Sequence, residues 1–299
     1  MYGSVLSVLS EEIILLIRLR EPALELCRLT NIGDRGKASL ETVCIFSLPT
    51  LTSRACLRGV DAIEEHPGHA LFSKSHQQYL SSYSYPHLAT SSGTDSSTRI
   101  GARSHRLRLR SVPGDGIVYV MMHFNALSGY DRMVDLFVRR RTLLEFSDPQ
   151  ARVGRKGVAG TGVRTVPIIP WETWGPTNSR ILDHDSLSWG DLSGERYATV
   201  LMSRITMQDF NPYRVRRALA VLGGAGREVT LGCGSMVKVV KEASVYRGGE
   251  FFLNDIETNL PYVETVTSYD GCHDFSMDEN YLVAEVLTAV SRVHLRFEN

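Results

Sequence analysis

Three stretches of the chain carry residue types that could do chemistry. Residues 64–69 read Glu-Glu-His-Pro-Gly-His and place the imidazoles of His66 and His69 beside two carboxylates, which are groups that can bind a zinc ion. Pro67 and Gly68 would break the helix on which a His-Glu-x-x-His zinc motif lies, and the order of the residues differs from that motif. An exposed loop is therefore the better interpretation, and we expect no metal ion or other cofactor.

Two further stretches contain glycines around a reactive or basic group. Residues 154–162 hold an Arg-Lys pair between glycines, but they lack the Gly-Lys-Ser/Thr ending and the strand-to-helix setting of a phosphate-binding loop. Cys233 lies between glycines, yet no nucleophile elbow surrounds it, so a β-turn is the stronger interpretation. The histidines that could serve as a base are His123, His184 and His273. We expect no enzyme, and a metal-dependent or Cys-dependent hydrolase remains the alternative.

Charged and aromatic residues in the middle of the chain are candidates for binding. Arg139, Arg140 and Arg141 could contact acidic partners, or they could protect an edge strand from aggregation. Trp171 and Trp174 are flanked by prolines on a stiff segment. Large aromatic side chains are mostly buried, which favours a place in the core, and an anchor at a recognition surface is the alternative.

The composition bounds the class of protein. The chain has 299 residues, 33 basic and 33 acidic side chains and a formal net charge of zero, which argues against general attraction to nucleic acid or to an anionic membrane. No apolar run approaches the roughly 20 residues of a membrane-spanning helix. The five cysteines are widely spaced and odd in number, as expected for free thiols in a reducing compartment. We therefore expect an intracellular protein, in the cytoplasm or the nucleus.

The composition and the pattern of apolar residues change along the chain and divide it into three regions. Residues 1–71 form an N-terminal segment in which Val5 to Leu29 predict a helix that ends or kinks at Pro22. Residues 72–104 are rich in Ser and His and poor in aliphatic residues, so we expect a linker or a disordered insertion. Residues 105–299 predict a β-rich domain.

Short apolar runs separated by turn signals dominate this third region. Runs rich in β-forming residues occur at 117–124, 133–138, 142–146, 197–206, 236–246, 250–254, 262–267, 281–287 and 292–297. One amphipathic helix is expected among them, with Asn211 as its N-cap, Pro212 in its first turn and glycines at its end. The expected fold is mainly β and antiparallel, with one short helix after a poorly ordered N-terminal region.

Two blocks of the sequence carry a family resemblance. The first is RTVPIIPWETWGPTNSRIL at residues 164–182, and the second begins with DFNPYRVRRAL at residue 209 and continues through KEASVYRGGEFFLNDIETNLPYVET to the Met277-Asp278-Glu279 turn. In this order the blocks resemble the C-terminal region of F-box proteins from mushroom-forming fungi, over roughly residues 115–297. The opening Leu-Pro-x-Glu helix of an F-box is only partly matched, by Leu9-Ser10-Glu11-Glu12-Ile13-Ile14.

The resemblance implies a divergent, propeller-like β domain that holds a client protein for a ubiquitin ligase. It also implies that an F-box, here degenerate or missing, would bind the adaptor of that ligase. We therefore expect a non-enzymatic protein-recognition module, and a truncated chain without independent function is a further alternative. The expected binding surface consists of Trp171, Trp174, Arg180, Arg139 and Arg140.

Overall fold

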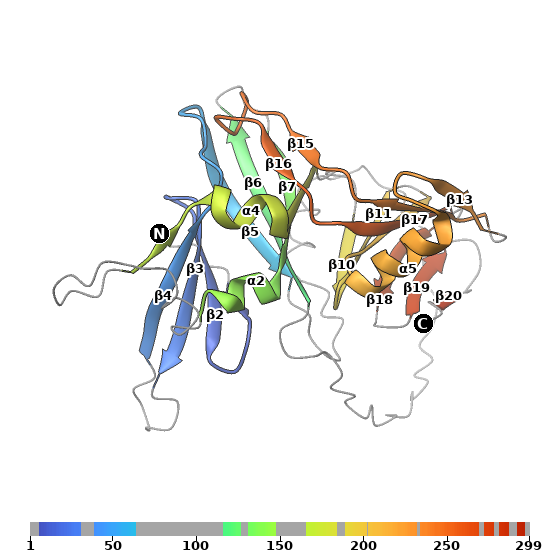
Figure 1. The fold of residues 1–299 in the computed structure, drawn as a ribbon, viewed down its shortest axis with the longest axis horizontal. Coiled ribbons are helices and arrows are strands. Elements are labelled where there is room, and N and C mark those ends of the chain that lie inside the picture. Colours follow the sequence, from blue (N-terminus) through green and yellow to red (C-terminus); the bar gives the residue numbers. More distant parts are fainter. Residues whose placement is uncertain are drawn as a thin grey trace, which may run out of the picture. The chain divides into compact units, whose positions relative to one another are not determined.

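The computed structural model shows a protein built mainly of antiparallel strands, with three helices in the part that it describes (Figure 1). It describes residues 6–30, 39–63, 116–126, 131–147, 166–183, 189–201, 203–231, 234–268, 272–277, 281–286 and 292–296. The predicted β-rich fold is confirmed. The strands form several separate sheets, and the propeller-like arrangement stays a prediction. The predicted linker at 72–104 lies outside the described residues.

The first sheet is made largely by the N-terminal residues. Its strands, in spatial order, are β1 (Leu6–Val8), β2 (Ile13–Arg18), β3 (Ala23–Thr30), β4 (Ser39–Ser47) and β8 (Ile168–Ile169). The helix predicted before Pro22 is therefore wrong. The run that begins at Ile13 is short, rich in β-branched residues and buried on both faces, which suits a strand. Pro22 lies in the turn between β2 and β3.

The second sheet contains β5 (Ala55–Ile63), β6 (Ile117–Ala126), β7 (Asp131–Arg139) and β9 (Ser179–Asp183) in that order. The strand predicted at residues 142–146 is wrong, because those residues belong largely to α2 (Arg140–Glu145). Two arginines at the start of this helix stabilise it, one through a local contact and one through a distant one. Arg141 donates to Glu145 one turn later at 3.0 Å, and Arg140 donates to the carbonyl oxygen of Leu9 at 2.7 Å.

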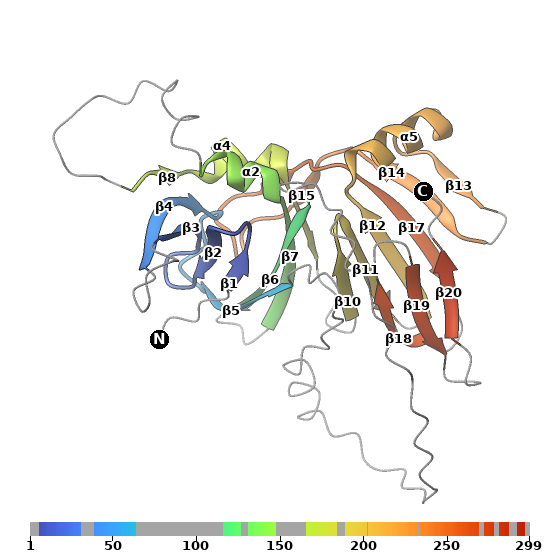
Figure 2. The ribbon, with the colours of Figure 1, turned by 90° about the horizontal axis from the view of Figure 1, so that it is seen from below.

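A large hydrophobic core joins the first and second sheets. Leu15, Leu24 and Phe46 of the first sheet pack in one cluster with Val120 and Leu136 of the second. Residues 1–65 and 111–299 accordingly group into one compact unit, shown from a second direction in Figure 2. The expectation of a poorly ordered region before the β domain is corrected for residues 6–30 and 39–63, which form strands of this unit.

The third sheet carries the only long amphipathic helix of the described residues. Its strands are, in spatial order, β10 (Trp189–Ser193), β11 (Arg196–Leu201), β12 (Arg204–Asp209), β17 (Tyr262–Ser268), β14 (Met236–Val240) and β13 (Glu228–Thr230). The predicted helix is confirmed as α5 (Pro212–Leu222), with Asn211 as its N-cap and Gly223 ending it at a φ of 73°. Its Val215 and Leu222 pack against Val239 of β14 and Val263 of β17.

The remaining strands form two small sheets. β15 (Ser244–Tyr246) pairs with β16 (Ile256–Thr258), and β18 (Cys272–Met277), β19 (Tyr281–Val286) and β20 (Arg292–Arg296) form an antiparallel sheet. The run predicted at 292–297 is thus an antiparallel strand over its first five residues. The loop from β15 to β16 inserts Phe251 and Phe252 into the core between the first and second sheets, beside Phe124.

Candidate functional site

The two tryptophans of the expected binding surface are core residues. They lie on α4 (Trp171–Asn178), where Trp174 is fully buried and donates its indole N–H to the carbonyl oxygen of Ser47 at 3.1 Å. The ring of Trp171 covers Gly175, where an added Cβ would come within 2.4 Å of it. Both side chains thus lie in the core, as their type favoured, and the alternative of a surface anchor is corrected. Trp174 attaches α4 to β4 of the first sheet.

Arg180 is also buried and not a surface residue. Its Nε donates to the carbonyl oxygen of Leu260 at 2.9 Å and its Nη1 to that of Glu242 at 3.0 Å, while the ring of Tyr262 lies 5.3 Å from the guanidinium carbon. Burial, the largest effect, lowers the pKa of Arg180 below its ordinary value. Arg180 therefore ties β9 to the segments before β15 and β17, and its place on the expected surface is wrong.

The three arginines where β7 ends and α2 begins make different contacts. Arg140 binds the carbonyl oxygen of Leu9 through two of its nitrogens, and Arg141 pairs with Glu145. Arg139 lines a hollow of the surface. Of the five residues expected to bind a partner, Arg139 is therefore the one whose position supports that role.

The hollow beside Arg139 has a volume of about 360 Å³ and is called the basic hollow here. It is lined by Arg139, Pro212, Val215, Arg216, Leu219, Lys241 and Pro261. These residues come from the end of β7, from α5, and from the residues that follow β14 and precede β17. Segments far apart in the sequence thus meet at one place.

The sequence of α5 explains how the apolar wall of the basic hollow is positioned. Asn211 accepts hydrogen bonds from the backbone N–H groups of Tyr213 and Arg214 at 2.9 and 3.2 Å, which fixes the start of the helix. Val215 and Leu219 are four residues apart and so lie on the same face. Because Val215 is also packed in the core below α5, the wall belongs to a rigid element.

The charges around the basic hollow are not balanced. Helix α5 contains Arg214, Arg216 and Arg217 and no acidic residue. The nearby buried carboxylate of Asp209 is committed to Arg196 at 2.9 Å and to Arg214 at 3.3 Å. Asp209 therefore pairs with Arg196 and Arg214, and not with the cations that line the basic hollow.

The three cationic side chains of the rim are Arg139, Arg216 and Lys241, and none forms an ion pair with another described residue. Arg216 is held in place, because its Nε donates to the carbonyl oxygen of Pro212 at 3.2 Å and its guanidinium carbon lies 4.7 Å from the ring centre of Tyr213. The acidic residue next to Lys241 in the sequence is Glu242, and its carboxylate accepts a hydrogen bond from the backbone N–H of Lys241. The rim therefore presents a net positive charge above an apolar wall.

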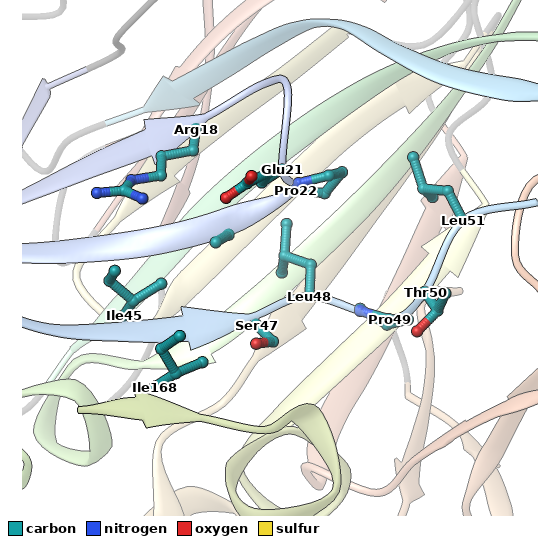
Figure 3. A pocket seen from close by; sticks show the side chains of 11 residues that line it. Arg18, Glu21, Pro22, Ile45, Ser47, Leu48, Pro49, Thr50, Leu51 and Ile168 are labelled. Carbon is teal, nitrogen blue, oxygen red and sulfur yellow. The ribbon is translucent and has the colours of Figure 1, made fainter. Parts of the chain in front are cut away.

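A second hollow, of about 290 Å³, lies at the end of the first sheet (Figure 3). It is lined by residues at the turn between β2 and β3, by Ile45, by residues 47–51, and by Ile168, which is 67% exposed. The cation at this hollow is already neutralised, because Arg18 donates to Glu25 at 2.6 Å and the pair lowers the pKa of Glu25. The second hollow thus offers apolar contact without the charge of the basic hollow.

The chemical candidates of the sequence fall mainly outside the described residues. Residues 64–69, residues 154–162, His184 and Cys233 all lie there, and for His273 only the backbone is described. His123 is half-buried on β6. Within the described part of the chain, no group of three His, Cys, Asp or Glu side chains has the spacing to hold a metal ion.

Most residues of the basic hollow could not be identified from the sequence. The pattern identified α5 and its apolar face, and a further signal was present in the three arginines of the same helix. Lys241 and Pro261 could not be connected with that helix, since only the pairing of β14 with β17 brings them together.

No helix of the described residues has both the length and the apolar character needed to cross a membrane. Comparisons of the chain with protein-family models, with curated proteins and with solved structures find no match.

Proposed function

We propose that this protein is a non-enzymatic recognition module that holds a partner protein at the basic hollow. The observation that supports this most strongly is the combination of an apolar wall, made by Val215, Leu219 and two prolines, with a rim of three cations. An apolar side chain of a partner gains free energy by leaving water at such a wall, and the cations add selectivity for the residues around it.

The rigidity of the basic hollow also supports recognition. Pro212 and Pro261 have restricted backbones, and α5 is capped at both ends and packed on the third sheet. Little conformational entropy is then lost when a partner binds, which favours affinity. Arginine is also enriched among the residues that dominate protein interfaces, and two line this hollow.

We further propose that the bound protein is the client of a ubiquitin ligase. The resemblance of residues 115–297 to the C-terminal region of F-box proteins supports this role. The described residues that were compared with an F-box opening, Leu9 to Ile14, form a turn and the start of β2 in place of a helix. Adaptor binding therefore has no support from this segment, and a pull-down of the chain with the adaptor and the cullin tests it directly. A folded chain that fails to associate would remove the ligase role and leave client binding as a separate question.

The recognition role is tested with a matched pair of charge reversals on α5. Arg216 lines the basic hollow, whereas its exposed neighbour Arg217 does not. Partners captured by the wild-type protein are identified, and one purified partner is titrated against wild type, Arg216→Glu and Arg217→Glu. We expect Arg216→Glu to weaken binding by about tenfold or more, and Arg217→Glu to change it by less than about threefold.

Equal binding by all three proteins would show that the partner is held elsewhere. A second charge reversal, Lys241→Glu, lies outside α5 and checks that any loss does not arise from damage to the helix. Circular dichroism and the thermal midpoint of each variant establish that the proteins compared are folded.

A further inference from the structure

We propose that the segment held in the basic hollow is an acidic stretch of the partner, in which aspartate or glutamate residues flank one apolar side chain. This inference rests on the proposed function and specifies its ligand. It follows from three features of the site, namely the charge of the rim, the state of the helix N-terminus and the size of the apolar wall.

The charge of the rim selects a negatively charged partner. Arg139, Arg216 and Lys241 come from three separate segments of the chain and line the hollow together with its apolar residues. Burying such cations against a neutral partner would remove them from water without compensation. Carboxylates on the partner would compensate this loss, and a cationic partner would be repelled.

The N-terminus of α5 distinguishes carboxylates from a phosphate group. Phosphate sites commonly use the free backbone N–H groups of the first helical turn. Here two of these groups, those of Tyr213 and Arg214, already donate to the side chain of Asn211. Pro212 has no N–H group to offer. The positive charge therefore resides on side chains spread around the rim, which suits several carboxylates better than one phosphate.

The lining of the hollow suits contact with one aliphatic side chain. Its volume of about 360 Å³ is at the lower end of the range for ligand pockets, which is roughly 300–1,000 Å³. The wall is made of Val215, Leu219, Pro212 and Pro261, without an aromatic ring. One leucine, isoleucine or methionine side chain fits this description, with the neighbouring residues of the segment placed near the cations.

Tyr213 extends this surface beyond the basic hollow. This residue is 73% exposed, and its ring lies beneath the guanidinium of Arg216. This contact keeps Arg216 at the rim while leaving its Nη nitrogens to donate to a carboxylate. We expect Tyr213→Ala to weaken binding of the acidic segment about threefold through loss of this support.

Fluorescence anisotropy with synthetic peptides tests the inference on the full chain. The first probe is a labelled peptide with a central leucine between Asp and Glu residues, the second replaces each acid by its amide, and the third carries phosphoserine in place of the acids. We expect the acidic peptide to bind at least about tenfold more tightly than the amide peptide, and to weaken as salt rises from about 50 to 300 mM. Replacing its leucine by serine should weaken binding about fivefold or more.

The matched variants separate a specific site from general attraction. Arg216→Glu should reduce the affinity for the acidic peptide about tenfold, and Arg217→Glu less than about threefold. Equal losses in both variants would overturn the inference in favour of a diffuse positive surface. Tighter binding of the amide peptide or of the phosphoserine peptide would overturn it as well.

If the purified partner depends on Arg216 while the acidic peptide does not bind, the inference fails and the proposed function stands. If the acidic peptide binds as expected and the partner is insensitive to Arg216, the proposed function fails.

Discussion

The hydroxyl of Tyr197 lies 3.1 Å from that of Tyr119 and donates a hydrogen bond to it. Tyr119 in turn donates to the Oδ1 atom of Asp135 at 2.8 Å, and the two tyrosine rings stack with their centres 4.7 Å apart. Tyr197 belongs to β11 of the third sheet, whereas Tyr119 and Asp135 belong to β6 and β7 of the second. This buried chain of polar groups therefore connects two sheets.

Removing the middle hydroxyl of this chain should destabilise the protein. Tyr119→Phe removes the hydroxyl that accepts from Tyr197 and donates to the buried Asp135, so we expect the free energy of unfolding to fall by about 1–3 kcal/mol. Tyr197→Phe removes the hydroxyl at the outer end of the chain and should cost about 0.5–1.5 kcal/mol. Urea denaturation of both variants measures the difference. Equal stability of Tyr119→Phe and wild type would show that this chain does not hold the sheets together.

The same tyrosines should make the fold sensitive to alkaline pH. Burial raises the pKa of Tyr119 and of Tyr197 well above 10, and it raises the pKa of Tyr262 to about 12. Above pH 10 the unfolded chain loses these protons and the folded protein keeps them. The stabilisation from the neutral tyrosines is therefore complete below pH 10 and is lost as the pH rises through the folded-state values.

Two measurements check this pH dependence. Ultraviolet absorbance of tyrosinate should show a fraction of the tyrosines ionising only as the protein unfolds, and the urea midpoint should fall steadily above about pH 10. Tyr197→Phe removes one of the raised pKa values and should flatten this decline. Ionisation of all tyrosines near pH 10 in the folded protein would contradict the buried positions of Tyr119 and Tyr197.

Gly175 is expected to tolerate no larger residue. A methyl group there would meet the ring of Trp171 at 2.4 Å, so Gly175→Ala should displace that ring and lower the free energy of unfolding by about 1–3 kcal/mol. Glu172→Ala, at an exposed position of the same helix, is the matched control and should change stability by less than about 0.5 kcal/mol. Thermal unfolding compares the two variants, and equal midpoints would contradict the packing of Trp171 on Gly175.

The cap of α5 gives a further prediction. Asn211→Ala removes the acceptor for two backbone N–H groups and should cost about 1 kcal/mol, whereas Asn211→Ser keeps an acceptor and should recover most of this loss. Because Pro212, Val215 and Arg216 follow directly, Asn211→Ala should also weaken binding at the basic hollow. Urea denaturation and peptide anisotropy on both variants measure the two effects, and an unchanged stability of Asn211→Ala would exclude the capping role.

Local signals in the sequence predicted α5 well and the first sheet badly. The Asn-Pro start and the glycine end of α5 are contained in one short stretch, so the helix could be placed without tertiary information. The run at Ile13–Leu19 is apolar at almost every position, and such a run does not separate a buried strand from a buried helix. Its partners β1 and β3 decide the outcome.

Tertiary contacts also explain the errors at the binding residues. Trp171, Trp174 and Arg180 are in a block with a strong motif, and that block is explained by packing, because each side chain is buried and makes a defined contact. Arg139 was identified only as part of an arginine run. Arg139 lies beside Lys241 and α5 because of contacts between segments more than 70 residues apart in the sequence. Such contacts cannot be predicted from local sequence patterns.

Titration of one purified partner against Arg216→Glu and Arg217→Glu is the most direct test of recognition at the basic hollow. The two variants differ by one position on the same helix and have the same net charge. We expect a dissociation constant about tenfold higher for Arg216→Glu and nearly unchanged for Arg217→Glu. Identical dissociation constants for the two variants would contradict it.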